Sequence, residues 1–270
     1  MTSAPKGRVL IVAGSDSGGG AGIQADIKTV TALGGFAMTA VTAITVQNTL
    51  GVTGVHEIPT EVVREQIEAV MGDLGADAWK LGMMGSAAHV RTVLEAYHAV
   101  GAGVPIVLDP VMIAKGGASL LAEDAVEVIR QQLVPVAAIV TPNAPEAEAL
   151  TGVEVRDLDG QMSAAEILVE QLGAYSALLK GGHIAGDIVR DVLLTREGYR
   201  VFEGPRIDTR ATHGTGCTLA SAIAAHIAQG AGIEPAVEKA REYLMEAIRR
   251  APGLGHGHGP LGHNWPLKLA

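Results

Sequence analysis

The sequence predicts an α/β protein in which a central, mostly parallel sheet is covered by helices on both faces. Short apolar, β-branched runs alternate along the chain with segments whose apolar residues recur at helical spacing. The apolar runs are almost continuous, as expected of strands buried on both faces, and alternating strand and helix units form parallel sheets through right-handed crossovers. No Pro- or Ser-rich linker and no repeat divides the chain, so we expect residues 1–270 to form a single domain.

The expected elements follow in chain order. Apolar runs predict strands at 8–14, 38–46, 78–84, 105–111, 137–143 and 175–182, and then an antiparallel hairpin with strands at 191–195 and 200–207. Helical spacing predicts helices through Ile23, Ile27 and Val30, through Val63, Ile67, Val70 and Leu74, through Val90, Val93, Leu94 and Tyr97, through Ala125, Val126, Ile129 and Leu133, and at 214–230 and 235–250. In such a sheet the ligand crevice lies at the carboxyl ends of the strands.

Composition narrows the function. A net charge of −9 and an aromatic content of 3% argue against a nucleic-acid-binding surface. No apolar run is long enough for a membrane span, and the N-terminal run is typical of a first strand, not of a signal peptide. The single cysteine, Cys217, allows no internal disulfide and fits a reducing compartment, so we expect a cytoplasmic protein.

The loop after the first strand, AGSDSGGGAGIQAD, is rich in glycine. Glycines let backbone amides approach a ligand closely. A flexible turn is the alternative, but five glycines in nine residues exceed what a turn requires. The pattern is neither a P-loop nor a dinucleotide fingerprint. Asp26 lies in the helix that follows, where a carboxylate is usually solvated. Gln47 follows the second strand, and its amide could pair with an amidine-like ring edge or simply cap the strand.

Acidic and amide side chains follow the central strands. Asp109 ends the run VLDP and is placed to hold Mg²⁺, or else to pair with a neighbouring turn amide. Asn143 and Glu146 stand three residues apart at a helix start, where both could orient metal-bound water. They also match a capping box, and the two roles are compatible.

Two further features suggest phosphate chemistry. Lys180 ends a buried strand and could meet a phosphate, although surface exposure is usual for lysine. Gly214, Thr215, Gly216 and Cys217 open a helix whose free amides favour an anion such as a phosphoryl group. The same field lowers a thiol pKa and would make Cys217 a thiolate base, whereas an isolated cysteine is more often a small core residue.

Taken together, seven motifs in order resemble the hydroxymethylpyrimidine/phosphomethylpyrimidine kinases of thiamin biosynthesis, which belong to the ribokinase-like superfamily. They are AGSDSGGGAGIQAD, TAITVQNTLGV, KLGMMG, VLDPVM, TPNAPEAEAL, LLKGGH and THGTGCTLASAIA, and they span about residues 8 to 250. The resemblance implies a ribokinase-like three-layer α/β/α sandwich. It also implies ATP-dependent phosphorylation of 4-amino-5-hydroxymethyl-2-methylpyrimidine and then of its monophosphate, with Mg²⁺, in a homodimer.

The resemblance also assigns roles to residues. The pyrimidine would be bound by Gly14, Ala21, Asp26, Gln47, Met83 and Val111. ATP would be bound by Asp109, Asn143, Lys180 and Lys239, and Mg²⁺ by Asp109 and Glu146. Gly214, Thr215 and Gly216 would form the anion hole, and Cys217 would be the base.

Alternatives remain. A pyridoxal kinase of the same fold is the main one, although the related enzymes carry a second cysteine in the lid and the segment IAKGGASLL at 113–121 has none. A non-catalytic pyrimidine-binding protein would not need the phosphate-binding residues. In the Gly- and His-rich tail, His256, His258 and His263 could bind a metal, but no cysteine or carboxylate accompanies them, so we expect a surface tail.

Overall fold

A computed structural model describes residues 5–112 and 123–267 of the chain. Its centre is a nine-stranded sheet in the order β3-β2-β1-β4-β5-β6-β7-β8-β9. The six strands from β2 to β7 in this order run parallel, and β3, β8 and β9 pair antiparallel at the two edges. The strands are β1 (Arg8–Asp16), β2 (Phe36–Asn48), β3 (Gly51–Glu57), β4 (Ala78–Leu81), β5 (Ile106–Leu108), β6 (Ile139–Val140), β7 (Ala177–Leu179), β8 (Ile188–Thr195) and β9 (Gly198–Pro205).

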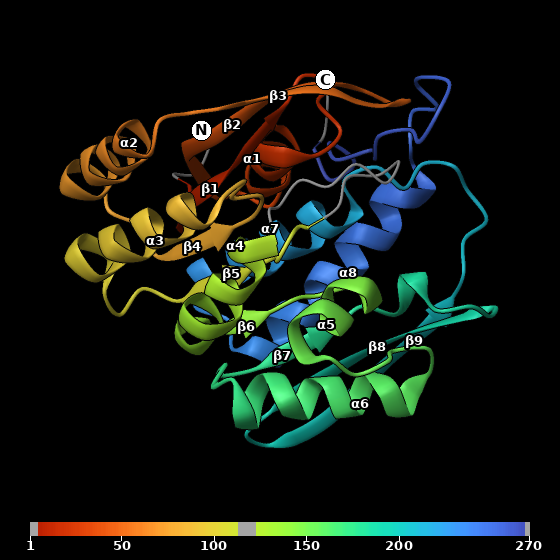
Figure 1. Ribbon diagram of the computed structural model, residues 1–270. Helices are drawn as coiled ribbons and strands as arrows, with labels where there is room; N and C mark the ends of the chain where they lie inside the picture. The colour runs from red at the N-terminus through yellow and green to blue at the C-terminus, as the bar shows by residue number, and fades with distance from the viewer. Residues whose placement is uncertain (1–4, 113–122, 268–270) are drawn as a thin grey trace.

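Helices cover both faces of the sheet, which gives the three layers that the sequence predicts (Figure 1). One face packs on α2 (Thr60–Asp73), α3 (Ala87–Ala96), α4 (Glu123–Val128), α5 (Ala144–Thr151) and α6 (Leu158–Glu166). The other packs on α1 (Gly22–Ala32), α7 (Thr215–Ala228) and α8 (Ile233–Arg249). The central strands are buried on both faces and contribute side chains to the apolar cores on both sides of the sheet, which explains their continuous apolar runs.

Two elements and one helix face differ from the sequence prediction. Strand β3 and helix α6 were not expected from the sequence. In α1, the predicted apolar stripe included Ile27, yet this side chain is 37% exposed. The buried face of α1 instead carries Asp26, which is fully buried and not solvated as expected. A polar residue thus occupies a core position, and it must have a partner there.

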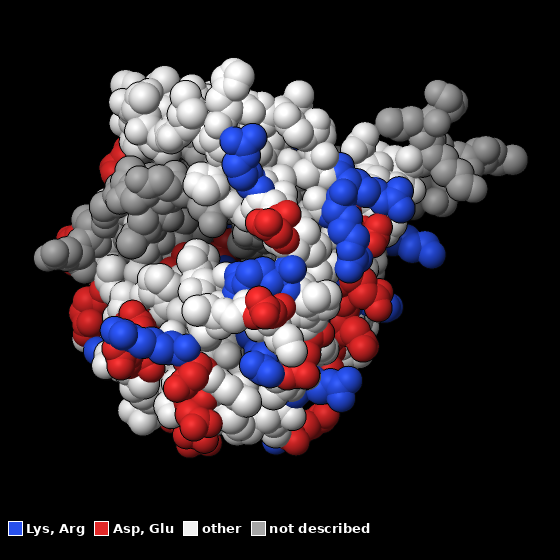
Figure 2. All heavy atoms as spheres, turned by 90° about the vertical axis from the view of Figure 1, so that its right-hand side faces the viewer, with Lys and Arg blue, Asp and Glu red and all other residues white. Residues whose placement is uncertain are grey.

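The described part of the chain contains no helix long and apolar enough to cross a membrane. On the face shown in Figure 2, the described Lys and Arg side chains are interspersed with Asp and Glu, and no broad basic surface extends across it.

Candidate active site

A cleft of about 600 Å³ lies at the carboxyl ends of the parallel strands. Its walls come from the loop after β1, from β4, from the segments after β5, β6 and β7, and from the first turn of α7. This is the edge at which parallel sheets place ligands. Most of the residues singled out from the sequence meet here, namely Gly14, Ala21, Gln47, Met83, Asp109, Val111, Asn143, Glu146, Lys180, Gly214, Thr215, Gly216 and Cys217.

The first turn of α7 forms the floor of the cleft. Gly214 caps this helix in the left-handed region, with φ of 80°, and a Cβ there would lie only 1.9 Å from the carbonyl oxygen of Gly20. A Cβ on Gly216 would lie 3.2 Å from Nζ of Lys180 and 3.4 Å from Oδ2 of Asp109. The glycines therefore let the helix amides approach the glycine-rich loop on one side and the charged residues on the other. Unpaired amides at a helix start favour an anion at this point.

A buried charge cluster faces this turn. Nζ of Lys180 lies 2.8 Å from Oδ1 of Asp109 and 3.7 Å from Oε2 of Glu146. Asn143 and Glu146 form the expected capping box, with hydrogen bonds of 3.0 Å and 2.8 Å. The backbone of Lys180 pairs with this segment through Pro142, which sets the lysine beside the helix start.

The carboxylates of this cluster fit a divalent cation. Oδ2 of Asp109 is buried and has no hydrogen-bond partner among the described residues. The pKa of Glu146 is raised to about 7, mainly by burial; the charge of Asp109 acts in the same direction, and Lys180 and the backbone amide of Asn143 oppose the shift. No three His, Cys, Asp or Glu side chains of residues 5–112 and 123–267 gather as a metal cluster. Two carboxylates suit Mg²⁺ in particular, because this ion commonly takes one or two carboxylates and completes its shell with water and substrate phosphates.

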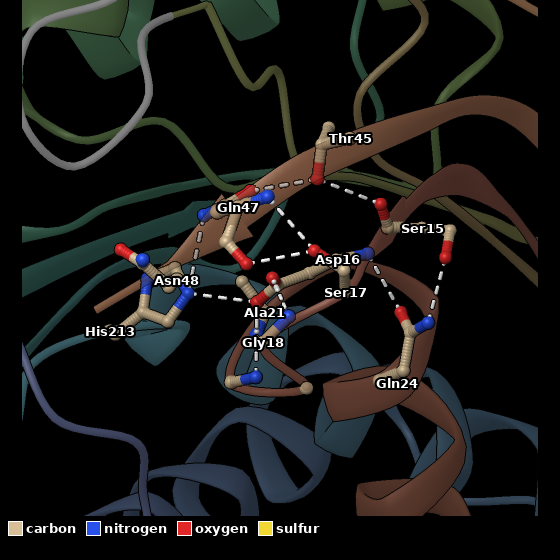
Figure 3. Close-up of polar contacts among 12 residues, drawn as sticks. Ser15, Asp16, Ser17, Gly18, Ala21, Gln24, Thr45, Gln47, Asn48 and His213 are labelled. Carbon is tan, nitrogen blue, oxygen red and sulfur yellow. Dashed lines mark hydrogen bonds and ion pairs between the residues drawn. The ribbon is translucent and has the colours of Figure 1, made fainter. Parts of the chain in front are cut away.

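At the other end of the cleft, Gln47 belongs to a network of hydrogen bonds (Figure 3). Asp16 accepts from the backbone amides of Gly18 and Ala21 at 2.8 Å each, and Nε2 of His213 also lies 2.8 Å away. His213 in turn lies 3.3 Å from the amide nitrogen of Gln47. Burial opposes the charge of Asp16, but the bonds from His213 and the loop amides outweigh it and lower the pKa of Asp16.

This network was not expected from the sequence, although His213 directly precedes the Gly-Thr-Gly turn. One carboxylate fixes both the glycine-rich loop and the imidazole, which lies beside the Gln47 amide. The Gln47 amide, half-buried in the cleft wall, keeps a donor and an acceptor for a ring edge.

Cys217 lines the cleft and is partly exposed. The sequence predicted a lowered pKa for this thiol, but the pKa is raised to about 12. Burial is the main cause, and the carboxylates of Asp26 and Asp109 add to it. Lys80 and the backbone amide of Gly22, which donates to the sulfur, act in the opposite direction. The prediction from the local helix start is therefore wrong for the protein without ligands, because desolvation and two buried carboxylates outweigh the favourable field.

Two residues lie elsewhere than the resemblance implied. Asp26 does not line the cleft but lies behind it, where Oδ2 accepts from Nζ of Lys80 at 3.0 Å. Lys239 is exposed on α8 and does not line the cleft, which Arg241 and Leu244 of the same helix do. Lys80 itself was not predicted, although a lysine inside the buried strand AWKL is a signal that sequence reasoning can use.

The tail is only in part the surface segment that the sequence predicted, because His256 and His258 are exposed whereas His263 is buried. Its residue His263 is 4% exposed and lies 2.9 Å from Oγ1 of Thr218, and burial lowers its pKa to about 4. The backbone of Gly259 accepts from the amide of His213, and that of His258 donates to Thr49. The tail therefore supports the wall that carries the His213 network. The expected lid at 113–121 lies outside the described residues.

One cleft contains a helix start that can hold an anion, a cluster of carboxylates and a lysine that can hold a cation and phosphates, and an amide that can pair with a ring edge. Together with the fold, this arrangement is that of a small-molecule kinase of the ribokinase-like type. The family model for phosphomethylpyrimidine kinase matches residues 16–262. The chain belongs to the phosphomethylpyrimidine kinase family.

Individual relatives agree with this assignment. The hydroxymethylpyrimidine/phosphomethylpyrimidine kinase of Streptomyces coelicolor is 49% identical over 96% of this chain and 95% of its own length. A thiamine biosynthesis bifunctional protein of Geobacter sulfurreducens is also 49% identical, and this chain spans 52% of its length. Among solved structures, the ADP complex of Bacillus subtilis pyridoxal kinase has a TM-score of 0.88 and 35% identity, and the match covers 96% of this chain and 97% of that chain.

Proposed function

We propose that this kinase transfers the γ-phosphoryl group of ATP to the 5-hydroxymethyl group of 4-amino-5-hydroxymethyl-2-methylpyrimidine, and then phosphorylates the resulting monophosphate to the diphosphate. The observation that carries the proposal is the position of the α7 turn between Gln47 and the cluster of Asp109, Glu146 and Lys180. A phosphoryl group at this turn lies between a site for a ring and a site for a nucleotide.

In this proposal each group of residues in the cleft has its own role. Gln47 pairs with the ring nitrogen and amino group of the pyrimidine, and Gly14, Ala21, Met83 and Val111 complete this pocket. Lys180 and Asn143 hold the phosphates of ATP. The amides of Gly214, Thr215 and Gly216 stabilise the charge that develops on the transferred group, which is the main requirement of phosphoryl transfer.

Asp109 and Glu146 would hold Mg²⁺, which neutralises the charge of the triphosphate when it is bound. For Glu146 to take part, its carboxyl must lose the proton that its raised pKa favours. Cation binding and ionisation of Glu146 are therefore coupled in this proposal.

Cys217 accepts the proton of the substrate hydroxyl in this scheme. A thiol with a pKa of about 12 is protonated at neutral pH, so the filled cleft must favour its thiolate. Replacement of Cys217 by Ser keeps the shape but gives a poorer base, and we expect Cys217→Ser to bind the pyrimidine normally and to lower kcat sharply. Unchanged turnover of this variant would mean that the thiol only fills space.

The decisive experiment compares substrates. Release of ADP from ATP and Mg²⁺ is measured with the pyrimidine alcohol, with its monophosphate and with pyridoxal, each over a range of concentrations. We expect the highest kcat/KM with the two pyrimidines. A preference for pyridoxal would favour the related vitamin kinase activity, and tight pyrimidine binding without ADP release would point to a binding protein.

We also propose that the enzyme is a homodimer of the cytoplasm. Ile44 and Val46 are two residues apart on β2, so they point to the same face of the sheet edge, and they are 48% and 50% exposed. A second copy would cover this apolar surface. Light scattering should give twice the chain mass for the native protein and a monomer for Val46→Glu. The use of ATP and of a free thiol suits a reducing, ATP-rich compartment.

A further inference from the structure

A fully buried ion pair lies directly behind the cleft. Lys80 of β4 and Asp26 of α1 are each 0% exposed, and Nζ and Oδ2 are 3.0 Å apart. The other carboxylate oxygen of Asp26 accepts from Oγ of Ser221 in α7 at 2.7 Å. The pair thus joins the sheet to two of the helices beside the cleft, α1 and α7. Buried ion pairs seldom stabilise a fold more than apolar residues of the same volume do, so another role has to be considered.

The geometry directs this pair toward the thiol. Ser221 and Cys217 are four residues apart on α7 and share one face of that helix. Gly22 and Asp26 have the same spacing on α1, and the amide of Gly22 donates to the sulfur. The thiol and the ion pair therefore occupy the same contact between the two helices.

Lys80 reaches the cleft itself. It is the residue of the pair that lines the cleft together with Cys217, whereas Asp26 lies behind it. A Cβ on Gly82 would lie 2.8 Å from Nζ of Lys80, so the glycine at this position leaves room for the ammonium. An ammonium has three donors, and Asp26 takes one of them at its buried side.

We propose that Lys80 is a positioning residue that acts through Cys217: its ammonium, fixed by Asp26, supplies the positive charge that allows the thiol to release its proton in the filled cleft. The proposal rests on the assignment of Cys217 as the base. Asp26, which the resemblance placed in the pyrimidine pocket, becomes the residue that holds Lys80.

The charges around the sulfur support this assignment. Lys80 on β4 lowers the pKa of Cys217, whereas Asp26 on α1 and Asp109 after β5 raise it, and Lys180 after β7 also interacts with the thiol. Burial opposes the charge of Lys80, but Asp26 and the neighbouring acidic groups outweigh it and raise the pKa of Lys80. The ammonium therefore stays charged in a place where an unpaired lysine would lose its proton.

The single cysteine makes a direct test possible. Alkylation of Cys217 by iodoacetamide, an uncharged reagent, is followed by intact mass at several pH values near 8. Loss of a positive charge a few ångströms away raises a thiol pKa by about 1–3 units. For each unit by which the thiol pKa rises, the thiolate fraction falls about tenfold, while the remaining thiolate becomes more nucleophilic and offsets part of this loss. Lys80→Met should therefore slow alkylation roughly 3- to 30-fold at constant pH.

Lys80→Met leaves the carboxylate of Asp26 buried without its positive partner and can unfold the protein. The same comparison is therefore repeated between Asp26→Asn and the double variant Asp26→Asn, Lys80→Met, which removes the pair as a unit. Lys6→Met controls for the change in net charge, because Lys6 is exposed and lies just before the first residue of β1, at the end of the strand away from the cleft. It should alkylate at the native rate.

The kinase reaction gives the second measurement. The acidic limb of the kcat profile with the pyrimidine alcohol should move to higher pH by about 1–3 units in the Lys80 variants, with little change in KM for ATP. Equal alkylation rates in both paired comparisons would overturn the proposal. Slower alkylation with an unmoved kcat profile would support the charge coupling and refute the base role of Cys217, so the two failures are distinguishable.

Discussion

Gly214 provides the sharpest test of how the cleft is built. The residue caps α7 with φ of 80°, a conformation that L side chains rarely adopt. In Gly214→Ala the new methyl carbon would lie 1.9 Å from the carbonyl oxygen of Gly20, whereas ordinary contact begins at 3.4 Å. The loop or the helix must therefore move by about 1.5 Å, and both line the cleft.

The magnitudes follow from this displacement. The left-handed conformation costs an alanine about 1–2 kcal/mol, which lowers the unfolding midpoint of a chain of this size by roughly 2–8 °C. A misplacement of 1 Å at an active site costs about 100-fold in rate. We therefore expect kcat of Gly214→Ala to fall at least about 100-fold.

A matched control lies at the far end of the same helix. Gly230 also has a positive φ, 91°, but nothing lies within 4 Å of the position that a Cβ would take there. Gly230→Ala should lose only the roughly 2–8 °C that the backbone conformation costs, and should keep its kcat. Thermal unfolding and steady-state ADP release are measured on both variants. If Gly214→Ala retained the turnover of Gly230→Ala, the packing of the α7 turn against the glycine-rich loop would not matter for catalysis.

Three further results are expected. Gly216→Ala places a methyl group 3.2 Å from Nζ of Lys180, so kcat should fall while thermal stability holds or rises, because alanine favours a helix. The pKa of Glu146 in the folded protein is raised to about 7 from 4.5. Its contribution to the stability of the Mg²⁺-free protein is therefore fully present below pH 4.5 and is lost as the pH rises through 7. The temperature of unfolding should fall over this pH range, and Glu146→Gln should abolish that fall. Gln47→Leu removes a paired hydrogen bond and should raise KM for the pyrimidine roughly 10- to 100-fold, with KM for ATP unchanged, and equal losses in both would contradict the assigned pocket.

The strands and the cleft were predictable because their signals are local. Continuous apolar runs identify buried parallel strands, and β5 and β7 end directly before Asp109 and Lys180. The capping box of Asn143 and Glu146 is a pattern of four residues and was confirmed. Position at the carboxyl end of a parallel sheet then brings these side chains together.

The errors concern interactions between distant parts of the chain. Asp26 can be buried because Lys80, 54 residues away in the sequence, pairs with it. The helical periodicity around Asp26 gives no information about this pair. The pKa of Cys217 shifts in the opposite direction from the prediction because burial, together with carboxylates from α1 and from the end of β5, outweighs the field of the local helix. The site assignments themselves, and the single domain, stay predictions.

The tail that supports the His213 wall has a consequence for synthesis. Thr49 and Gly20 near the beginning of the chain meet residues 257–260 near its end. A growing polypeptide can form the sheet from β1 to β9 before this wall exists, because residues 257–260 follow every strand of the sheet in the sequence. Catalytic competence should therefore be acquired in a late step of folding, after the core has formed.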